Sequence, residues 1–192
     1  MTAVILAGGK SIRMGSNKAF LKFKGKTFIE RQIDLLSEIF DEIIISANTP
    51  SEYEYLNLPI IEDIYPEKGP LGGIYTGLIN SRSLYTFMLA CDMPFVEIEL
   101  IKHLESITKG YDVVVPQSDR GLEPLHAFYS KNCIDPIKRE LDRNNLRIIS
   151  FFPHVNVKIV ELDTLTPSDS FKNSIKNLNT KEEYKTITSS ID

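Results

Sequence analysis

Short apolar runs that do not alternate with polar residues recur along the chain, and they constrain its fold more than any other feature. The four clearest runs are AVILA (3–7), EIIISA (42–47), TFMLAC (86–91) and DVVVP (112–116). A strand that is apolar at nearly every position is typical of a parallel sheet that is buried on both faces. We therefore expect these runs to be strands of a mainly parallel sheet.

Stretches with helical character separate these runs. The expected helices are 26–40, 72–81, 97–108 and 132–143, and two weaker strands are expected at 58–62 and 157–162. Thr27 and Glu30 form a capping box at the start of the first helix. Regular alternation of strand and helix predicts an α/β architecture, a three-layer fold around a twisted, mainly parallel sheet. The LHAFYS stretch (125–130) alternates less cleanly, and we expect it to pair antiparallel.

Length and composition fit one globular domain over residues 1–192. The 22 Lys and Arg residues and 26 Asp and Glu residues give a formal net charge of −4, which disfavours a nucleic-acid polymer as a partner. Two cysteines are too few for a disulfide framework or a zinc site. We see no apolar stretch long enough for a membrane span and no secretion signal, so we expect a cytoplasmic protein without a membrane partner.

The first apolar run ends in the loop LAGGKSIRMGSNK (6–18). Ligands of open parallel sheets bind beyond the carboxyl ends of the strands, and this loop follows such an end. Its glycines allow backbone N–H groups to approach an anion, while Arg13 and Lys18 add charge-assisted contacts that suit a polyphosphate. The spacing fits neither a Walker A loop nor a Rossmann fingerprint. A solvated turn with incidental cations is the alternative.

The motif CDMPF (91–95) directly follows the apolar run TFMLA, which places Asp92 at the carboxyl end of a strand. Mg²⁺ prefers one or two carboxylates together with phosphate oxygens. Asp92 is therefore a candidate Mg²⁺ ligand on the same edge of the sheet as the opening loop. A carboxylate that caps the next helix is the alternative.

The segment EKGPLGGIYTGL (67–78) is a Gly-rich approach to a helix. Gly69, Gly72 and Gly73 allow the backbone to come close to a flat base or to a second substrate. Asn48 and Asp63 also follow apolar strands, and a carboxylate can accept hydrogen bonds from the N–H groups of guanine. Taken alone, each of these residues is more often a turn residue.

The opening loop resembles the signature L-A-G-G-x-S-x-R-M-G-x-x-K of nucleotidyltransferases with a glycosyltransferase-A-like fold. With GPLGGI and CDMPF downstream, the chain is most similar to the molybdenum cofactor guanylyltransferases, from Leu6 to about Tyr184. The resemblance implies transfer of GMP from GTP to a molybdopterin-type acceptor, with Mg²⁺ as cofactor and Arg13, Lys18 and Asp92 in catalytic roles. The nucleotide contacts that it implies are Leu6, Ala7, Gly8, Gly9, Lys18, Asn48, Asp63, Gly72 and Asp92.

The resemblance implies acceptor contacts at Asn177 and Asn179, within the closing segment IKNLNTKEEY. It gives Arg120 and Glu123 a weaker place beside the second substrate, and it implies molybdoenzymes or cofactor-biosynthesis proteins as partners. A lone histidine in a strand is usually a packed side chain, and we interpret His126 in this way. The region 143–167 carries no motif that we can assign.

Two alternatives stay open. A cytidylyltransferase or a sugar-phosphate nucleotidylyltransferase would use the same scaffold, because base choice depends on a few contacts. A non-catalytic protein that holds GTP or a pterin would bind nucleotide without releasing pyrophosphate. The presence of Arg13, Lys18 and Asp92 together favours an enzyme.

Overall fold

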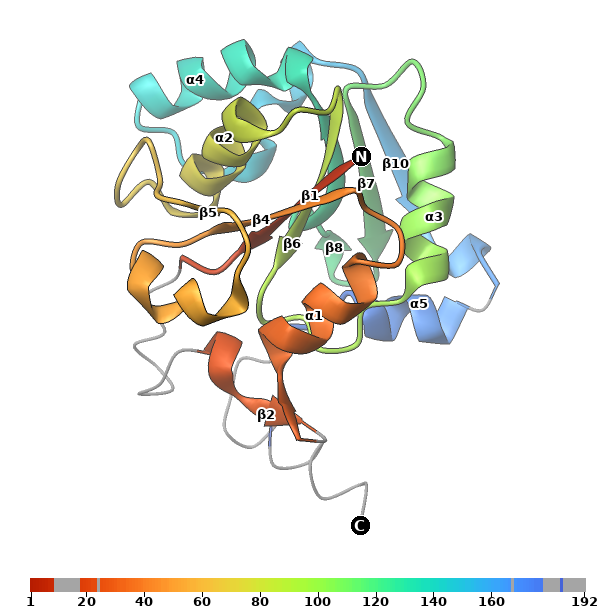
Figure 1. Ribbon diagram of the computed structural model, residues 1–192. Coiled ribbons are helices and arrows are strands. Elements are labelled where there is room, and N and C mark those ends of the chain that lie inside the picture. Colours follow the sequence, from red (N-terminus) through yellow and green to blue (C-terminus); the bar gives the residue numbers. More distant parts are fainter. Residues whose placement is uncertain (9–17, 24, 167, 178–183, 185–192) are drawn as a thin grey trace.

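The computed structural model describes residues 1–8, 18–23, 25–166, 168–177 and 184 (Figure 1). These residues form an eight-stranded sheet and a small two-stranded one. The strands of the large sheet are β1 (Thr2–Leu6), β4 (Glu42–Ser46), β5 (Ile60–Ile61), β6 (Tyr85–Ala90), β7 (Val113–Ser118), β8 (Gly121–Leu122), β9 (His126–Ser130) and β10 (Val157–Glu161). Their order is β10-β7-β9-β6-β1-β4-β5, with β8 paired to β7.

The prediction of a mainly parallel sheet is confirmed. Strand β1 lies between β6 and β4 and is parallel to both, and β4–β5 and β10–β7 are parallel as well. Strand β9 runs antiparallel to both neighbours, which confirms the expectation for LHAFYS, and β8 runs antiparallel to β7. Because β6 and β7 are each antiparallel to β9, which lies between them, β6 and β7 run in the same direction.

Helices cover both faces of the sheet, as the three-layer prediction requires. The helices are α1 (Phe28–Leu36), α2 (Gly69–Asn80), α3 (Ile98–Ser106), α4 (Ile134–Asp142) and α5 (Ser168–Ser174). Helices α2 and α4 lie on one side, and α1 and α3 lie on the other, with α5 next to α3 (Figure 1). The region 143–167, in which the sequence carries no assignable motif, contains a 3₁₀ helix, Ile148–His154, followed by β10, which confirms the strand expected at 157–162.

The pleat of each central strand explains why the apolar runs do not alternate. Ala3 and Ile5 belong to the core under α1 and α3, whereas Val4 between them belongs to the core under α2 and α4. Residues Phe87 and Met88 of β6 divide in the same way. Both faces are buried, so every position in the strand needs an apolar side chain.

Two helices, α1 and α2, differ most from their predicted bounds. The capping box of Thr27 and Glu30 is confirmed, but α1 ends at Leu36 rather than at residue 40. Residues 26–27 are not helical and instead form strand β3 (Lys26–Thr27), which pairs with β2 (Lys22–Phe23). Helix α2 begins at Gly69, three residues earlier than expected, because Gly69 has a positive φ of 62° and Pro70 fits the first helical turn.

Gly77, in the second half of α2, lets this helix pack closely against the sheet. A Cβ atom at Gly77 would lie 3.1 Å from methyl groups of Val4 and Met88. A side chain at this position would push α2 away from β1 and β6.

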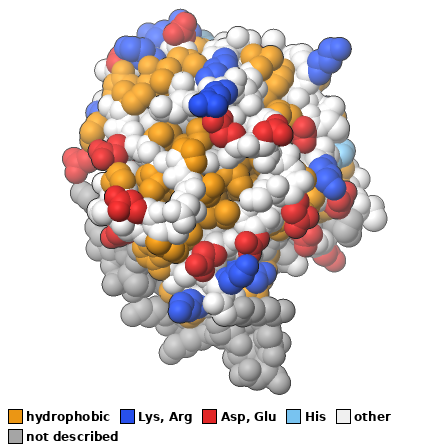
Figure 2. Space-filling model, viewed as in Figure 1, with side chains coloured by type: hydrophobic (Ala, Val, Ile, Leu, Met, Phe, Trp, Pro, Cys, Tyr) orange, Lys and Arg blue, Asp and Glu red, His pale blue; other side chains and the backbone are white. Residues whose placement is uncertain are grey.

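The surface carries mixed charge. On the face shown in Figure 2, acidic and basic side chains are interspersed among apolar ones, in keeping with the small net charge. Among the described residues, none of the helices combines the length and the apolar character that a membrane crossing needs.

His126 is a packed core residue, in agreement with its interpretation from sequence. It is fully buried, its ring meets Phe87 edge to face at 5.1 Å, and neither ring nitrogen has a hydrogen-bond partner within the described part of the chain. Burial lowers the pKa of His126 to about 3 from its usual 6.5. The folded protein therefore holds this imidazole neutral and away from any ligand.

The buried histidine makes stability depend on pH. Between about pH 6.5 and pH 3 the unfolded chain binds a proton at His126 and the folded chain does not, so acid favours unfolding. We expect the free energy of unfolding to fall by about 2 kcal/mol from pH 7 to pH 5 through this residue. Urea unfolding of wild type and His126→Leu at both pH values measures the effect. If the two proteins have equal pH dependence, His126 is not held neutral.

Candidate active site

The strand register brings four loop residues to one level at the carboxyl edge of the sheet. Leu6 of β1 lies opposite Ser46 of β4 and Ala90 of β6, and Ser46 lies opposite Ile61 of β5. Two residues beyond this row the four strands continue to Gly8, Asn48, Asp63 and Asp92. Residues that are far apart in sequence therefore share one edge, as the sequence analysis expects.

Lys18 and Asp92 meet at this edge. The ammonium group of Lys18 donates a hydrogen bond to Oδ2 of Asp92 at 3.0 Å, and the two side chains are only 15% and 20% exposed. Lys18 belongs to a 3₁₀ turn, Lys18–Phe20, which returns from the opening loop. The two charges compensate each other in a site with little solvent. The structure thus brings the two predicted residues together, and a ligand common to both stays a prediction.

Three of the predicted site residues cannot be placed. Gly9, Arg13 and Asn179 lie outside the described residues.

Gly8 packs against Asn48 at the end of β1. A Cβ atom at Gly8 would lie 3.1 Å from the side-chain amide nitrogen of Asn48. The backbone before Gly8 is held by the N–H of Ala7, which donates to the carbonyl of Ser46, and by the hydroxyl of Tyr53, which donates to the carbonyl of Ala7. The start of the glycine loop is therefore fixed to β4 and to the segment that follows it.

Asp63 is a half-buried carboxylate on the same edge. Ser46 donates a hydrogen bond to its Oδ1 at 2.9 Å. Burial raises the pKa of Asp63, and the hydrogen bond from Ser46 opposes this shift. Ser46 occupies one oxygen and leaves the carboxylate able to accept further hydrogen bonds from a ligand.

The two glycines of the GPLGG segment have different surroundings. A Cβ atom at Gly73 would lie 3.0 Å from the side chain of Leu6 and 3.7 Å from Oδ1 of Asp63, so Gly73 adjoins the site. A Cβ atom at Gly72 would instead lie 3.1 Å from the carbonyl of Tyr65 and close to Lys68. Gly73 therefore packs against Leu6 beside Asp63, whereas Gly72 packs against the segment that precedes α2, and the predicted nucleotide contact of Gly72 stays a prediction.

Sequence reasoning missed a positioning residue for Asp92. Gln32 of α1 is buried, and its side-chain amide donates to the carbonyls of Ala90 at 2.9 Å and of Met93 at 2.8 Å. These carbonyls flank Asp92 in the chain, so Gln32 holds the turn that carries it. The only sequence signal is a polar residue within the apolar stripe of α1.

Neither the cysteines nor His126 is suited to act as a nucleophile or a base in this site. Burial raises the pKa of both cysteines, Cys91 and Cys133, to about 12, so both are neutral thiols at pH 7. His126 lies within the core. Nucleophilic catalysis by a cysteine or general-base catalysis by His126 therefore has no support in this geometry.

The donor set at Asp92 fits Mg²⁺. The described residues contain no group of three or more His, Cys, Asp or Glu side chains arranged to hold a metal. Asp92 thus offers one carboxylate close to Lys18, which suits an ion that takes its other oxygens from phosphates and water. The geometry does not suit a structural zinc site.

The predicted acceptor residues lie near β7 and β8, at the β10 end of the strand order, whereas Asp63 lies near the β5 end. Glu123 accepts a hydrogen bond from Ser118 at 3.3 Å, and burial raises its pKa, which nearby Arg120 partly opposes. Asn177 follows α5, and its side-chain oxygen is buried without a hydrogen-bond partner in the described structure. These residues are grouped around β7, β8 and α5 rather than beside Asp63.

The role of Gln32 can be tested through stability. Gln32→Met keeps a similar volume but removes the side-chain donor from the carbonyls of Ala90 and Met93, and the carbonyl of Ala90 keeps only the longer bond from the N–H of Met93 at 3.4 Å. We expect the free energy of unfolding, measured with urea, to fall by about 2 kcal/mol. Asp34→Asn, on the same helix, removes one exposed ion pair with Lys26; it is the control and should change the free energy by less than about 1 kcal/mol. Equal stabilities of Gln32→Met and wild type would argue against this positioning role.

Comparisons with known proteins agree with this geometry. Residues 3–155 match the family model described as the MobA-like NTP transferase domain. A probable molybdenum cofactor guanylyltransferase from Clostridium perfringens strain 13 is 40% identical over 97% of this chain and 95% of its own length. A molybdenum cofactor guanylyltransferase from Desulfosudis oleivorans is 38% identical over 95% of this chain and 92% of its own length.

Among solved structures, molybdopterin-guanine dinucleotide biosynthesis protein A from Archaeoglobus fulgidus superposes with a TM-score of 0.85. It is 26% identical, and the match covers 99% of this chain and 98% of that one. The family model and the identities of these relatives lead to one conclusion, and the pair formed by Lys18 and Asp92 at the carboxyl edge agrees with it. This chain belongs to the family of MobA-like NTP transferases.

Proposed function

We propose that this protein transfers GMP from GTP to the phosphate of a molybdopterin-type acceptor and releases pyrophosphate. The observation that carries the proposal is the 3.0 Å contact between Lys18 and Asp92 at the carboxyl edge of the sheet. It joins a cation for phosphates and a carboxylate for Mg²⁺ in one site. The names of the guanylyltransferase relatives support the choice of reaction. In this proposal residues 1–192 act as one domain, and the expected cytoplasmic location stays a prediction.

The reaction needs alignment and charge neutralisation more than it needs a base. An oxygen of the acceptor phosphate attacks the α-phosphorus of GTP, and the bond from the α-phosphorus to the bridging oxygen breaks. Pyrophosphate leaves with that electron pair. A phosphate monoester has its second pKa near 6, so it is largely ionised at pH 7. This agrees with the lack of a suitable cysteine or histidine among the described site residues.

The residues of this chain divide these tasks. Lys18, with Arg13 from the opening loop, would neutralise the triphosphate, and the backbone of residues 6–9 would contact the nucleotide. Asp92 would hold Mg²⁺, which would neutralise further phosphate charge and align the phosphates. Bound Mg²⁺ and triphosphate would replace the charges that Lys18 and Asp92 now supply to each other.

Asp63 is our candidate for recognising the base. Guanine presents two adjacent N–H donors on one edge, whereas cytosine and adenine present a donor next to an acceptor. A carboxylate can accept from both guanine donors. Gly73 packs close to Asp63, and Asn48 lies near the start of the glycine loop. We further propose Asn177 and Asn179 as contacts for the acceptor, with molybdoenzymes or cofactor-biosynthesis proteins as protein partners.

A pyrophosphate-release assay tests the proposed function. With Mg²⁺ and molybdopterin, we expect release from GTP to exceed release from CTP, UTP or ATP by at least tenfold, because Asp63 pairs with two donors only in guanine. Preferential use of CTP would favour the cytidylyltransferase alternative. Nucleotide binding without release from any triphosphate would favour a binding protein.

Substitutions of the paired charges test their roles. Asp92→Asn and Lys18→Ala should each reduce the rate of transfer by about a hundredfold or more, because each removes one preorganised electrostatic group. Lys26→Ala, at an exposed cation of β3 outside this site, is the control and should keep its rate. Circular dichroism checks that each variant is folded. Rates near wild type for both variants would refute the assignment.

A further inference from the structure

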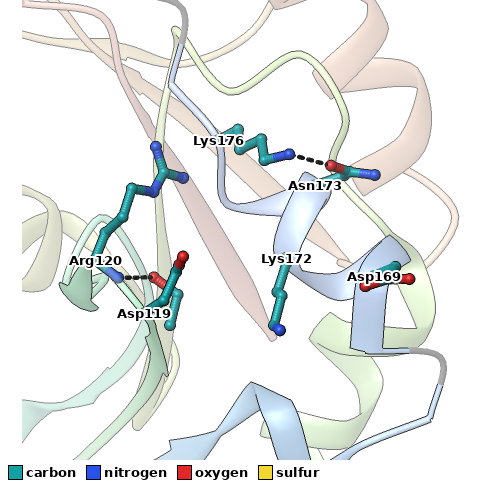
Figure 3. Close-up of a pocket in the computed structure, with 7 residues that line it drawn as sticks. Asp119, Arg120, Asp169, Lys172, Asn173 and Lys176 are labelled. Carbon is teal, nitrogen blue, oxygen red and sulfur yellow. Dashed lines mark hydrogen bonds between the residues drawn. The ribbon is translucent and has the colours of Figure 1, made fainter.

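The carboxylates at the carboxyl edge of the sheet differ in the charges that surround them. Asp92 pairs with Lys18. Asp119 follows β7 and lines a cavity between the β7–β8 turn and α5, and three cations line the same cavity (Figure 3). Asp63, in contrast, makes no ion pair with any residue in the described part of the chain. Its negative charge therefore depends on a neutral neighbour.

That neighbour is Ser46, the last residue of β4. Its hydroxyl donates a hydrogen bond to Oδ1 of Asp63 at 2.9 Å, and the residue is only 2% exposed. Ser46 lies two residues after Ile44, which belongs to the core under α2 and α4, so its side chain faces α2 as well. Among the described residues, no other group donates a hydrogen bond to the carboxylate of Asp63. The carboxylate thus depends on a single hydroxyl.

Helix α2 fixes the positions of both residues. A Cβ atom at Gly73 would lie 3.7 Å from Oγ of Ser46 and 3.7 Å from Oδ1 of Asp63. The hydroxyl of Thr76, which is fully buried, accepts a hydrogen bond from the backbone N–H of Ile64 at 2.9 Å. The chain directly after Asp63 is therefore held against α2, and the carboxylate stays within reach of Ser46.

The charge of Asp63 decides which base edge it can recognise. An ionised carboxylate accepts hydrogen bonds at both oxygens, whereas a protonated one donates at one oxygen and accepts at the other. The first pattern matches the two adjacent N–H donors of guanine, and the second matches the donor next to an acceptor in cytosine and adenine. Burial raises the pKa of Asp63, and the hydrogen bond from Ser46 opposes this shift because it favours the charged form. No charged side chain of β4, β5 or α2 adds to these two causes.

We propose that Ser46 is a specificity-determining residue, which keeps Asp63 in the ionised form that selects guanine over cytosine and adenine. This inference rests on the proposed function, in which Asp63 contacts the base. Ser46 acts through Asp63 and is therefore a positioning residue. Its role differs from that of Lys18 and Asp92, whose proposed partners are phosphates that every nucleoside triphosphate carries. A change at Ser46 should alter the choice of base and leave the affinity for the triphosphate as it is.

Calorimetric titration of GTP and of CTP with Mg²⁺, at pH 6 and at pH 8, tests this inference. Protonation of the triphosphate affects both nucleotides alike, so the ratio of their Kd values reports the base contact. At pH 6 we expect Ser46→Ala to lose about tenfold of the wild-type preference for GTP, because the variant lacks a hydrogen bond to the charged form of Asp63. At pH 8 the loss should be less than about threefold, because the lower proton concentration restores the ionised carboxylate.

Three further variants separate the charge of Asp63 from packing. Ser46→Thr keeps the hydroxyl and should retain the wild-type preference at both pH values, whereas Asp63→Asn cannot ionise and should lose it at both. Ser130→Ala is the matched control, because Ser130 is also 2% exposed and donates to the carboxylate of Asp112 at 3.0 Å. Ser130 pairs with Tyr85 at the start of β6, far from the ligand edge, and its loss should leave the preference unchanged.

The outcomes distinguish this inference from the proposed function. If wild type prefers GTP and Ser46→Ala keeps that preference at both pH values, or loses it equally at both, the inference is wrong and the proposed function stands. The same holds if Ser130→Ala loses as much preference as Ser46→Ala. If wild type prefers GTP but releases no pyrophosphate with an acceptor, the proposed function fails, and a loss confined to pH 6 in Ser46→Ala would still support the role of Ser46. Equal affinity of wild type for GTP and CTP would refute the base contact of Asp63 and this inference together.

Discussion

The parallel register of β1 with its two neighbours is the constraint on which the rest of the structure depends. Hydrogen bonding places Leu6 level with Ser46 and Ala90. The loops that follow must therefore emerge together from one edge. A shift of one residue in β1 would turn Val4 from one core to the other and move the glycine loop away from Asp92. The apolar side chains on both faces of the strand prevent this shift, so core packing and site geometry have the same origin.

The ion pair between Lys18 and Asp92 lies at the edge that this register creates. Two opposite charges that are each at most one-fifth exposed are costly to hold without a partner. Each therefore stabilises the other until a ligand that supplies both signs of charge arrives. A triphosphate with its metal ion is such a ligand. Gln32 and the capping box at the start of α1 fix the framework around the pair.

Much of the fold and part of the site follow from the sequence, because they depend on local pattern. The apolar runs predicted the central strands, and the position of Asp92 after TFMLA predicted its place on the ligand edge. The start of α2 and the different surroundings of Gly72 and Gly73 did not follow, since they depend on tertiary contacts with Tyr65 and Leu6.

The central claim is that Asp92 and Lys18 belong to one site for a metal-bound triphosphate. Calorimetric titration of GTP into wild type and Asp92→Asn, each with Mg²⁺ and with EDTA, tests it most directly. The account predicts that Mg²⁺ strengthens GTP binding at least tenfold in wild type and far less in Asp92→Asn. The same gain from Mg²⁺ in both proteins would contradict it.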